Sequence, residues 1–368
     1  MEFKAAVLHE VGAPLAIETV SAGPLQPDDV LVKIRASSIC HTDLEVITGD
    51  LPYPLPMVLG HEAAGTVAEV GANVTHVAPG DSVVLSWNPH CGHCYYCDKG
   101  LPIQCETYQK HRNTGTHFDG GHRLSLNGNP LNILMYLGGF AEYVVVAANS
   151  AVKVPAQMPL DRACLIGCGV MTGVGAATNI AKVEFGSSAV VIGCGAIGLS
   201  AIQGARLSGA SRIIAVDLNP EKLALARQVG ATDVIEAGNA DVIAEVKKLT
   251  EGRGADYVFE AAGHEDVFRL SIDICRPGGH VTWLGKVAVN RDVSFNWGSL
   301  MPERTIRRSS YGGAKPHRDF PALAGAYMSG RLMLDEIVTN RITLDQINDG
   351  FDALRSGKAI RTVIEFLA

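Results

Sequence analysis

A glycine-rich turn between an apolar strand and a helix is the feature of this sequence that most limits its possible folds. The spacing G-x-G-x-x-G is formed by Gly193, Gly195 and Gly198. It follows the apolar run 189–192 and precedes a helical pattern that continues to Leu207. Glycines at this spacing permit a tight turn and let a pyrophosphate approach the backbone at a helix N-terminus. The arrangement predicts a dinucleotide site in a strand-turn-helix unit.

Strand and helix patterns alternate around this turn. The runs AVVIGCG, RIIAVD, PEKLALARQVGA, ADVIAEVKKLT, ADYVFEAAG and HVTWLG follow one another at the spacing of βαβ units, from about residue 186 onward. Such alternation is typical of an α/β fold with a doubly wound parallel sheet.

Asp217 ends the strand RIIAVD, about twenty residues after the turn. A carboxylate at this place accepts hydrogen bonds from ribose hydroxyls and repels a 2′-phosphate, so it favours NAD over NADP. The alternative is a glycine-rich turn followed by an ordinary acidic strand end. Lys222, slightly further on, either reaches the adenosine ribose or is an exposed helix lysine.

The chain is long enough for two domains. Its 368 residues exceed what one hydrophobic core usually serves. A formal net charge of −7 excludes a general nucleic-acid or anionic-membrane binder. We expect no secretory signal, because the first residues lack a basic region followed by an apolar one, and glycines interrupt the longest apolar stretch, 189–205. The expected location is cytoplasmic.

The first 150 residues follow another pattern. Short β-branched runs at 30–37, 64–71 and 81–87, separated by Gly and Pro, predict a β-rich domain. After about residue 312 we expect a helix, a segment at 342–357 and a final strand in RTVIEF that rejoins the first domain. The stretch 106–138 is predicted to be a long irregular loop near a functional surface.

Four of the nine cysteines lie in one short segment: Cys91, Cys94, Cys97 and Cys105. In a reducing compartment such a pattern indicates metal rather than disulfides. Four thiolates complete the tetrahedral shell of Zn²⁺ and leave no open position, so the site is structural. Free thiols or disulfides are the alternative. We expect the neighbouring histidines, His90 and His93, not to be ligands.

A second set of candidate ligands is dispersed. It consists of Cys40 in the segment CHTD, His61 followed by Glu62, and Cys168 in IGCGVMTG. Two thiolates and one imidazole on one Zn²⁺ leave a fourth position for water or substrate, the pattern of catalytic zinc in alcohol dehydrogenation. Taken singly, each residue is equally compatible with an inert buried side chain.

Together these motifs resemble the medium-chain, zinc-containing alcohol dehydrogenase family over essentially the whole chain. The resemblance lies in GHEAAGTVAEVG, CGHCYYCDKGLPIQC, VIGCGAIGL and VDLNPEKLALARQVGATD, in the family's order. It implies a GroES-like catalytic domain at 1–169, a Rossmann NAD-binding domain at 170–311 and a C-terminal segment at 312–368 that returns to the catalytic domain. The segment after Cys105, ending in GGFAEYVVV, is similar to the long-loop dimeric classes, which implies a homodimer, with a tetramer as a possible further assembly.

The resemblance also assigns catalytic roles. Cys40, His61 and Cys168 would hold the catalytic zinc of two zinc ions per subunit, with Glu62 as an occasional ligand. Asp43 would accept the other imidazole N–H of His61, unless it only caps a turn.

The family's hydroxyl position is occupied by Thr42, which would take the alcohol proton; the alternative is a capping threonine. Typical members relay this proton through a His three residues later, where Glu45 stands here. Glu45 either relays the proton or is an exposed helix residue, the proton then leaving through ribose hydroxyls and water.

Further positions are implied to bind the coenzyme. His41 and Arg361 match family positions that contact the pyrophosphate. Thr172 and Ile197 would pack on the nicotinamide ring.

The substrate channel is implied to involve four side chains: Leu51, Trp87, Leu134 and Met135. Such an apolar pocket favours primary aliphatic or aromatic alcohols and their aldehydes. Glutathione-linked formaldehyde dehydrogenase is the alternative, although Gly49 and Leu51 stand where that class has acidic and arginine contacts. A non-catalytic binding protein and a zinc-free reductase are further alternatives, which the ligand set argues against. The sequence leaves the physiological alcohol and the preferred direction open.

Overall fold

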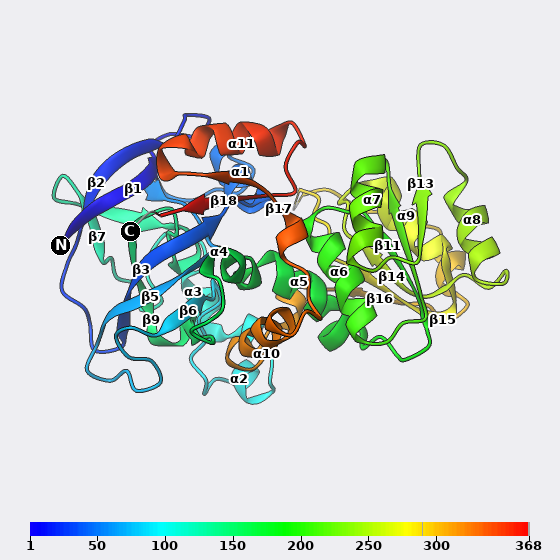
Figure 1. Cartoon of the computed structure of the whole chain (residues 1–368), viewed down its shortest axis with the longest axis horizontal. Helices are drawn as coiled ribbons and strands as arrows, with labels where there is room; N and C mark the ends of the chain where they lie inside the picture. The colour runs from blue at the N-terminus through cyan, green and yellow to red at the C-terminus, as the bar shows by residue number, and fades with distance from the viewer. Residues whose placement is uncertain (289, 367–368) are drawn as a thin grey trace. The chain divides into compact units, whose positions relative to one another are not determined.

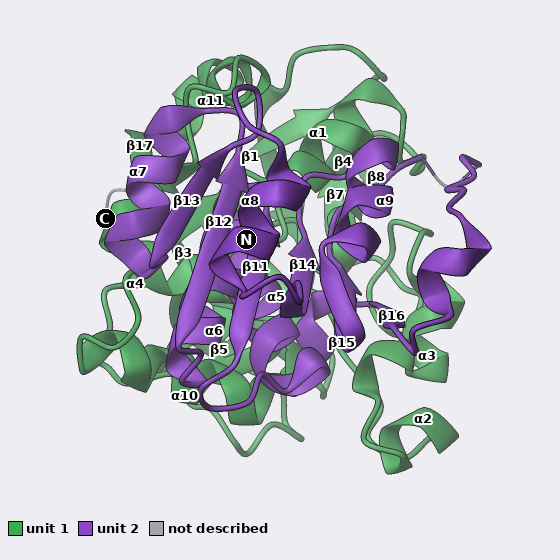
Figure 2. Cartoon of the chain, turned by 90° about the vertical axis from the view of Figure 1, so that its right-hand side faces the viewer, with its two compact units in different colours: residues 1–168, 315–368 green, residues 169–314 purple. Residues whose placement is uncertain are grey.

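The computed structural model describes residues 1–288 and 290–366, and the chain forms two compact units (Figure 2). The first contains residues 1–168 and 315–368, and the second contains residues 169–314. The sequence predicts these limits at 169/170 and 311/312. The last two residues of the predicted segment 312–368 lie outside the described residues.

The second unit is built on a parallel sheet (Figure 1). Its strands, in spatial order, are β13 (Asp233–Glu236), β12 (Arg212–Asp217), β11 (Ser188–Ile192), β14 (Ala255–Glu260), β15 (Cys275–Trp283) and β16 (Thr305–Arg308). The order runs in one direction from β11 to β13 and in the other from β14 to β16, so it reverses between β11 and β14. This is the doubly wound arrangement, and the predicted α/β fold class is confirmed.

Local sequence explains these elements. The inner strand β11 reads SAVVI and is almost entirely buried, as expected for a parallel strand covered on both faces. Asn219 caps the following helix α7 by accepting hydrogen bonds from two backbone N–H groups, and a proline stands in its first turn. The helices are α5 (Gly169–Gly175), α6 (Ala196–Leu207), α7 (Pro220–Val229), α8 (Val242–Leu249) and α9 (Glu265–Asp273).

The first unit is rich in strands. A closed barrel contains β1 (Glu2–Leu8), β2 (Ala16–Ala22), β7 (Leu124–Leu126), β8 (Asn129–Ile133) and β4 (Met57–Val58). A second sheet runs in the order β10 (Ala151–Lys153), β6 (Ser82–Leu85), β5 (Ala63–Val70), β3 (Asp29–Ser38), β18 (Arg361–Glu365) and β17 (Val338–Ile342), with β9 (Tyr143–Ala147) paired to β3. The C-terminal strand β18 therefore pairs with β3 of the N-terminal half.

The helices of this unit connect the strands. They are α1 (His41–Thr48), α2 (Tyr95–Asp98), α3 (Glu106–His111), α4 (Leu160–Ala163), α10 (Pro316–Met328) and α11 (Ile347–Arg355). Among the described residues, no single helix is long and apolar enough to span a membrane; the segments 160–167 and 169–181 reach the required length and composition only as a bent pair.

The stretch 106–138 differs from the prediction of an irregular loop. It contains α3 and the antiparallel pair β7 and β8, which belongs to the barrel. Asn127 and Gly128 turn the chain between the two strands, and both have positive φ angles, of 50° and 80°. Asn-Gly is a strong signal for a two-residue hairpin turn, because both positions favour this conformation.

Candidate active site

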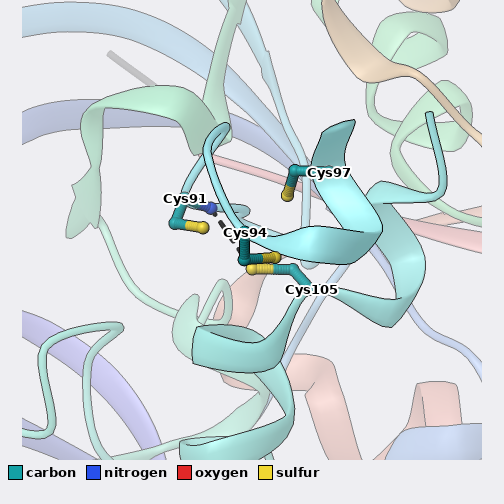
Figure 3. A group of neighbouring side chains, drawn as sticks. All are labelled: Cys91, Cys94, Cys97 and Cys105. Carbon is teal, nitrogen blue, oxygen red and sulfur yellow. Dashed lines mark hydrogen bonds between the residues drawn. The ribbon is translucent and has the colours of Figure 1, made fainter. Parts of the chain in front are cut away.

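The four cysteines of the lobe at 91–105 gather their sulfur atoms in one group, all within 4.8 Å of one another. Figure 3 shows the four thiols turned toward one another from the loop and the two short helices. The backbone N–H of Cys91 donates a hydrogen bond to Cys105 Sγ at 3.3 Å. Hydrogen bonds from the backbone N–H groups of Glu106 and Cys97 lower the pKa of Cys94 to about 6. These N–H groups favour a thiolate at Cys94, whereas burial raises the pKa values of Cys97 and Cys105. Four sulfur ligands at this spacing suit a closed zinc site.

The two histidines of this lobe lie outside the sulfur group. His93 Nδ1 is 2.8 Å from the backbone oxygen of Cys91. The backbone oxygen of His90 accepts a hydrogen bond from the side-chain amide of Asn149. Neither imidazole belongs to the group that the cysteines form.

A second group joins residues that are far apart in the sequence. One ligand atom from each of Cys40, His61, Glu62 and Cys168 lies within 4.8 Å of the others. Cys40 caps the N-terminus of α1 after β3, and His61 and Glu62 precede β5. Cys168 follows a short 3₁₀ helix at 164–167 and is half-buried, whereas the other three are buried. All four belong to the first unit.

Asp43 holds this group together from behind. Its completely buried carboxylate lies 3.1 Å from His61 Nδ1 and accepts hydrogen bonds from the backbone N–H groups of Gly60 at 3.0 Å and Cys40 at 3.1 Å. Because an ionised carboxylate only accepts, Nδ1 carries the proton and Nε2 keeps its lone pair. His61 Nε2 is buried and has no hydrogen-bond partner within the described residues.

The pKa values of these neighbouring groups shift in different directions: a hydrogen bond to Cys40 and burial raise the pKa of Cys168 well above its ordinary value. A hydrogen bond from Cys168 lowers the pKa of Cys40 well below its ordinary value, although burial opposes this shift. Burial alone would lower the pKa of His61, but the charges of Asp43 and Cys40 raise it well above its ordinary value. The helix α1 also points its N-terminus at Cys40, which stabilises a thiolate there.

Arg361 lies beside Glu62, a contact that the sequence did not reveal. Its Nη2 is 3.1 Å from Glu62 Oε1, and its Nη1 donates to the backbone oxygen of Ile39 at 3.2 Å. Burial raises the pKa of Glu62 to about 8, and the charge of Arg361 opposes that rise. The contact of Arg361 with a pyrophosphate stays a prediction.

The atoms of the second group fit a zinc ion. His61 Nε2 and Glu62 Oε2 are buried without a hydrogen bond from the described residues, whereas Glu62 Oε1 faces the guanidinium of Arg361. Each unsatisfied buried acceptor costs about 1–3 kcal/mol, and a cation bound in this group would satisfy both atoms. Two sulfurs and one imidazole nitrogen are donors that zinc takes in catalytic sites while it keeps one position open.

The glycine-rich turn has the geometry of a phosphate cradle. A Cβ atom on Gly193 would lie 2.8 Å from the backbone of Ala261 and Ala262, and one on Gly198 would lie 1.8 Å from Gly193 O. These two glycines are therefore required by the protein backbone itself. Gly195 caps α6 and has no atom within 4 Å of its Cβ position, so the space over the helix N-terminus is left clear.

Asp217 braces this turn from the next strand. Its Oδ2 accepts the backbone N–H of Cys194 at 2.7 Å, and its Oδ1 accepts that of Asn219 at 2.9 Å. Strand pairing places Glu236 of β13 opposite Asp217, so two carboxylates lie at this end of the sheet. Lys222 lies in the first turn of α7, where its backbone N–H donates to Asn219 Oδ1 at 3.4 Å.

The remaining predicted residues lie as follows. His41 is exposed and Thr42 half-buried in the first turn of α1, directly after the ligand Cys40, and Glu45 is half-buried one turn later. Ile197 is half-buried in the first turn of α6. Thr172 is buried in α5 of the second unit.

Three of the four predicted channel residues share one apolar cluster. Leu134 is completely buried there, and Leu51 and Met135 pack against it. Trp87 belongs to a different cluster and lies near Tyr108, with 6.3 Å between ring centroids.

Tyr108 is a residue that sequence reasoning missed. It is buried on α3 between Trp87 and Tyr136, with 5.3 Å between its ring centroid and that of Tyr136. Burial raises its pKa, and the neighbouring Tyr53 adds to this rise. The only signal in the sequence was an aromatic residue shortly after the fourth cysteine, Cys105.

Comparisons with known proteins agree with this architecture. Residues 26–156 match the alcohol dehydrogenase GroES-like domain, and residues 196–328 match the zinc-binding dehydrogenase domain. The chain is 40% identical to alcohol dehydrogenase class-3 of Myxine glutinosa, over 98% of this chain and 97% of that protein. The chain belongs to the zinc-dependent alcohol dehydrogenase family. It is therefore an oxidoreductase.

Two further relatives of this family bear on its activity. The chain is 39% identical to S-(hydroxymethyl)glutathione dehydrogenase of Escherichia coli O1:K1, over the full length of both. The crystal structure of benzyl alcohol dehydrogenase from Acinetobacter calcoaceticus covers the full length of both chains with a TM-score of 0.95 and 34% identity.

Elemental analysis tests the two ligand groups. We expect about two zinc ions per chain in the wild type and about one in each of Cys94→Ser and Cys40→Ser, because each variant breaks one group. Cys94→Ser also lowers the melting temperature, since a closed structural zinc contributes folding free energy.

Cys275→Ser is the matched control, because Cys275 is buried and lies outside both groups. It keeps about two zinc ions. Retention of both ions in Cys40→Ser would contradict the second assignment.

Proposed function

We propose that this protein is an NAD-linked dehydrogenase that interconverts primary alcohols, aliphatic or aromatic, and their aldehydes by hydride transfer. The observation that carries the proposal is the second ligand group, in which the thiols of Cys40 and Cys168 lie close to the imidazole of His61. Cys168 is half-buried, whereas the other two are buried. The open coordination position of such a zinc site is where substrate binds.

Zinc held by Cys40, His61 and Cys168 would supply a Lewis acid that stabilises negative charge on the alcohol or aldehyde oxygen. The protein prepares this site through Asp43, which fixes the tautomer and the orientation of His61. Glu62 lies beside the ligands as an occasional further ligand, and the buried guanidinium of Arg361 contacts its carboxyl group.

We further propose that Thr42 accepts the proton of the alcohol. Its place in the first turn of α1, two residues after Cys40, supports this role. Glu45 lies one turn further along the same helix and replaces the family's relay histidine, so its role remains a prediction.

NAD is the proposed cofactor, and Asp217 and Glu236 support this choice. A 2′-phosphate beside two carboxylates at the carboxyl ends of β12 and β13 would be repelled. Gly193, Gly195, Gly198, Ile197 and Lys222 are the proposed contacts in the second unit, together with Thr172. His41 and Arg361 are proposed contacts from the first unit.

Glutathione-linked oxidation of formaldehyde is a second candidate function. It is favoured by the likeness to the Escherichia coli S-(hydroxymethyl)glutathione dehydrogenase. The aromatic group around Trp87 and Tyr108, and the likeness to benzyl alcohol dehydrogenase, favour the first. Trp87, Leu51, Leu134 and Met135 remain the proposed channel residues.

A substrate series separates these functions. We expect kcat/KM for benzyl alcohol to exceed that for 1-phenylethanol at least about tenfold, because one extra methyl at the reacting carbon meets a narrow site. NADH formation is measured by absorbance. Equal kcat/KM values for the two alcohols would contradict a narrow site at the reacting carbon. Faster turnover of formaldehyde with glutathione than of any alcohol would establish the second function.

Asp217→Asn tests the cofactor choice. We expect the ratio of kcat/KM with NAD to that with NADP to fall at least about tenfold, because removing the charge relieves repulsion of the 2′-phosphate. Asp233→Asn, at the opposite end of the neighbouring strand β13, is the control and leaves the ratio unchanged. A wild type that prefers NADP would refute the proposal.

We also propose a homodimer and a cytoplasmic location. Two exposed apolar residues in the segment that precedes the edge strand β16 support the dimer: Trp297 is 76% exposed and Met301 is 74% exposed. None of the nine cysteines, all within the described part of the chain, forms a disulfide bond, which suits a reducing compartment.

Light scattering tests the dimer. We expect twice the mass of one chain for the wild type and for Phe185→Lys, whose side chain is 90% exposed elsewhere in the same unit. Trp297→Lys shifts the protein toward the monomer, because a charge replaces an apolar contact. A dimer that Trp297→Lys leaves intact would exclude this surface as the interface.

A further inference from the structure

A buried glutamate lies where the strand order of the parallel sheet reverses. Glu260 ends β14, which pairs with β11, the strand that leads into the glycine-rich turn. In sheets of this type, ligands bind outside the carboxyl ends of the strands at the reversal. Glu260 is 0% exposed, and no role in the proposed reaction has been given to it above.

The contacts of Glu260 tie two loops together. Its Oε1 accepts the backbone N–H groups of Ala262 at 2.8 Å and Gly263 at 2.7 Å. Its backbone oxygen accepts those of Leu284 at 2.7 Å and Gly285 at 3.0 Å. The residue therefore fixes the loop after β14 and the start of the loop after β15.

The loop after β14 in turn supports the glycine-rich turn. The backbone N–H of Ala261 donates to Ile192 O at 2.8 Å, directly before the turn. A Cβ atom on Gly193 would lie 2.8 Å from the backbone of Ala261 and Ala262, so the two backbones are already in close contact. The position of this loop therefore limits where Gly193, the first glycine of the turn, can lie.

Burial of the Glu260 carboxyl group is energetically unfavourable, and its contacts offset part of that cost. Burial raises the pKa of Glu260, while the N–H groups of Gly263, Ala262 and Gly285 and the charge of Arg308 oppose that rise. A Cβ on Gly285 would lie 2.4 Å from Oε2, so the loop after β15 also packs closely on the carboxyl group. The N–H groups that the carboxyl accepts offset part of the cost of its burial and hold the loop 261–263 in place.

We propose that Glu260 is a positioning residue for the dinucleotide: its side chain holds the loop 261–263 against Gly193 and so sets the shape of the phosphate cradle. This inference rests on the proposed use of NAD. It assigns to Glu260 an effect on coenzyme affinity that is transmitted through the backbone of the turn.

Direct binding of NAD to the purified full-length protein, followed by fluorescence titration, tests the proposal. Glu260→Met keeps the size of the side chain but removes both acceptors, and we expect it to raise the Kd for NAD at least about tenfold. In Glu260→Gln the amide oxygen still accepts both N–H groups, so the Kd stays within about threefold of the wild type. The KM for the alcohol is unchanged in both variants.

Asp256→Asn is the matched control. Asp256 lies at the other end of β14 and also accepts a backbone N–H, that of Ser188 at 2.8 Å. We expect Asp256→Asn to lower the melting temperature without changing the Kd for NAD. If Glu260 had only a structural role, the Glu260 variants would show this same result. If Glu260→Met does not fold, Glu260→Asp, which withdraws the acceptor by one methylene, replaces it with the same expectation.

The outcomes separate the two claims. A wild type that binds no NAD refutes the proposed function itself. A wild type that binds NAD while Glu260→Met or Glu260→Asp binds it equally tightly overturns the positioning role and leaves the proposed function intact.

Discussion

The carboxylate of Asp43 is the contact on which the second ligand group depends. It joins three parts of the first unit: the N-terminus of α1 through Cys40, the loop before β5 through Gly60, and the ring of His61. The contact of Asp43 with Nδ1 leaves His61 Nε2 buried and without a hydrogen bond from the described residues. The contacts that fold this part of the backbone therefore also orient a metal ligand. Replacing this carboxylate would loosen all three parts at once.

The two ligand groups suit zinc in two different roles. In the lobe at 91–105 four sulfurs leave nothing for a substrate to bind, and the ligands are close in sequence, so one loop forms the whole site. In the second group the ligands come from three separate segments. The pairing of β3 with β5 brings Cys40 near His61 and Glu62, and the 3₁₀ helix at 164–167, which packs on these strands, leads into Cys168. The sheet of the first unit therefore positions the second group, while the lobe stabilises a surface loop.

Local patterns in the sequence predict the parallel sheet, the glycine-rich turn and the four-cysteine lobe, because their spacing is set by neighbouring residues. No local spacing links Cys40, His61 and Cys168; their donor types suggest a catalytic zinc set, and the family resemblance assigns the three residues to it. The ion pair of Arg361 with Glu62 and the hydrogen bonds of Glu260 to Leu284 and Gly285 are tertiary contacts, which no periodicity encodes. The hairpin at 124–133 was predictable from Asn127 and Gly128, and describing the stretch as irregular overlooked that turn signal.

X-ray absorption at the zinc edge tests the central claim of an incompletely filled, sulfur-containing site beside a closed one. With both groups of the wild-type protein loaded, the account predicts an average of about three sulfur neighbours at about 2.3 Å and about one nitrogen or oxygen per zinc. An average of about four sulfurs, or of about two or fewer, would contradict it.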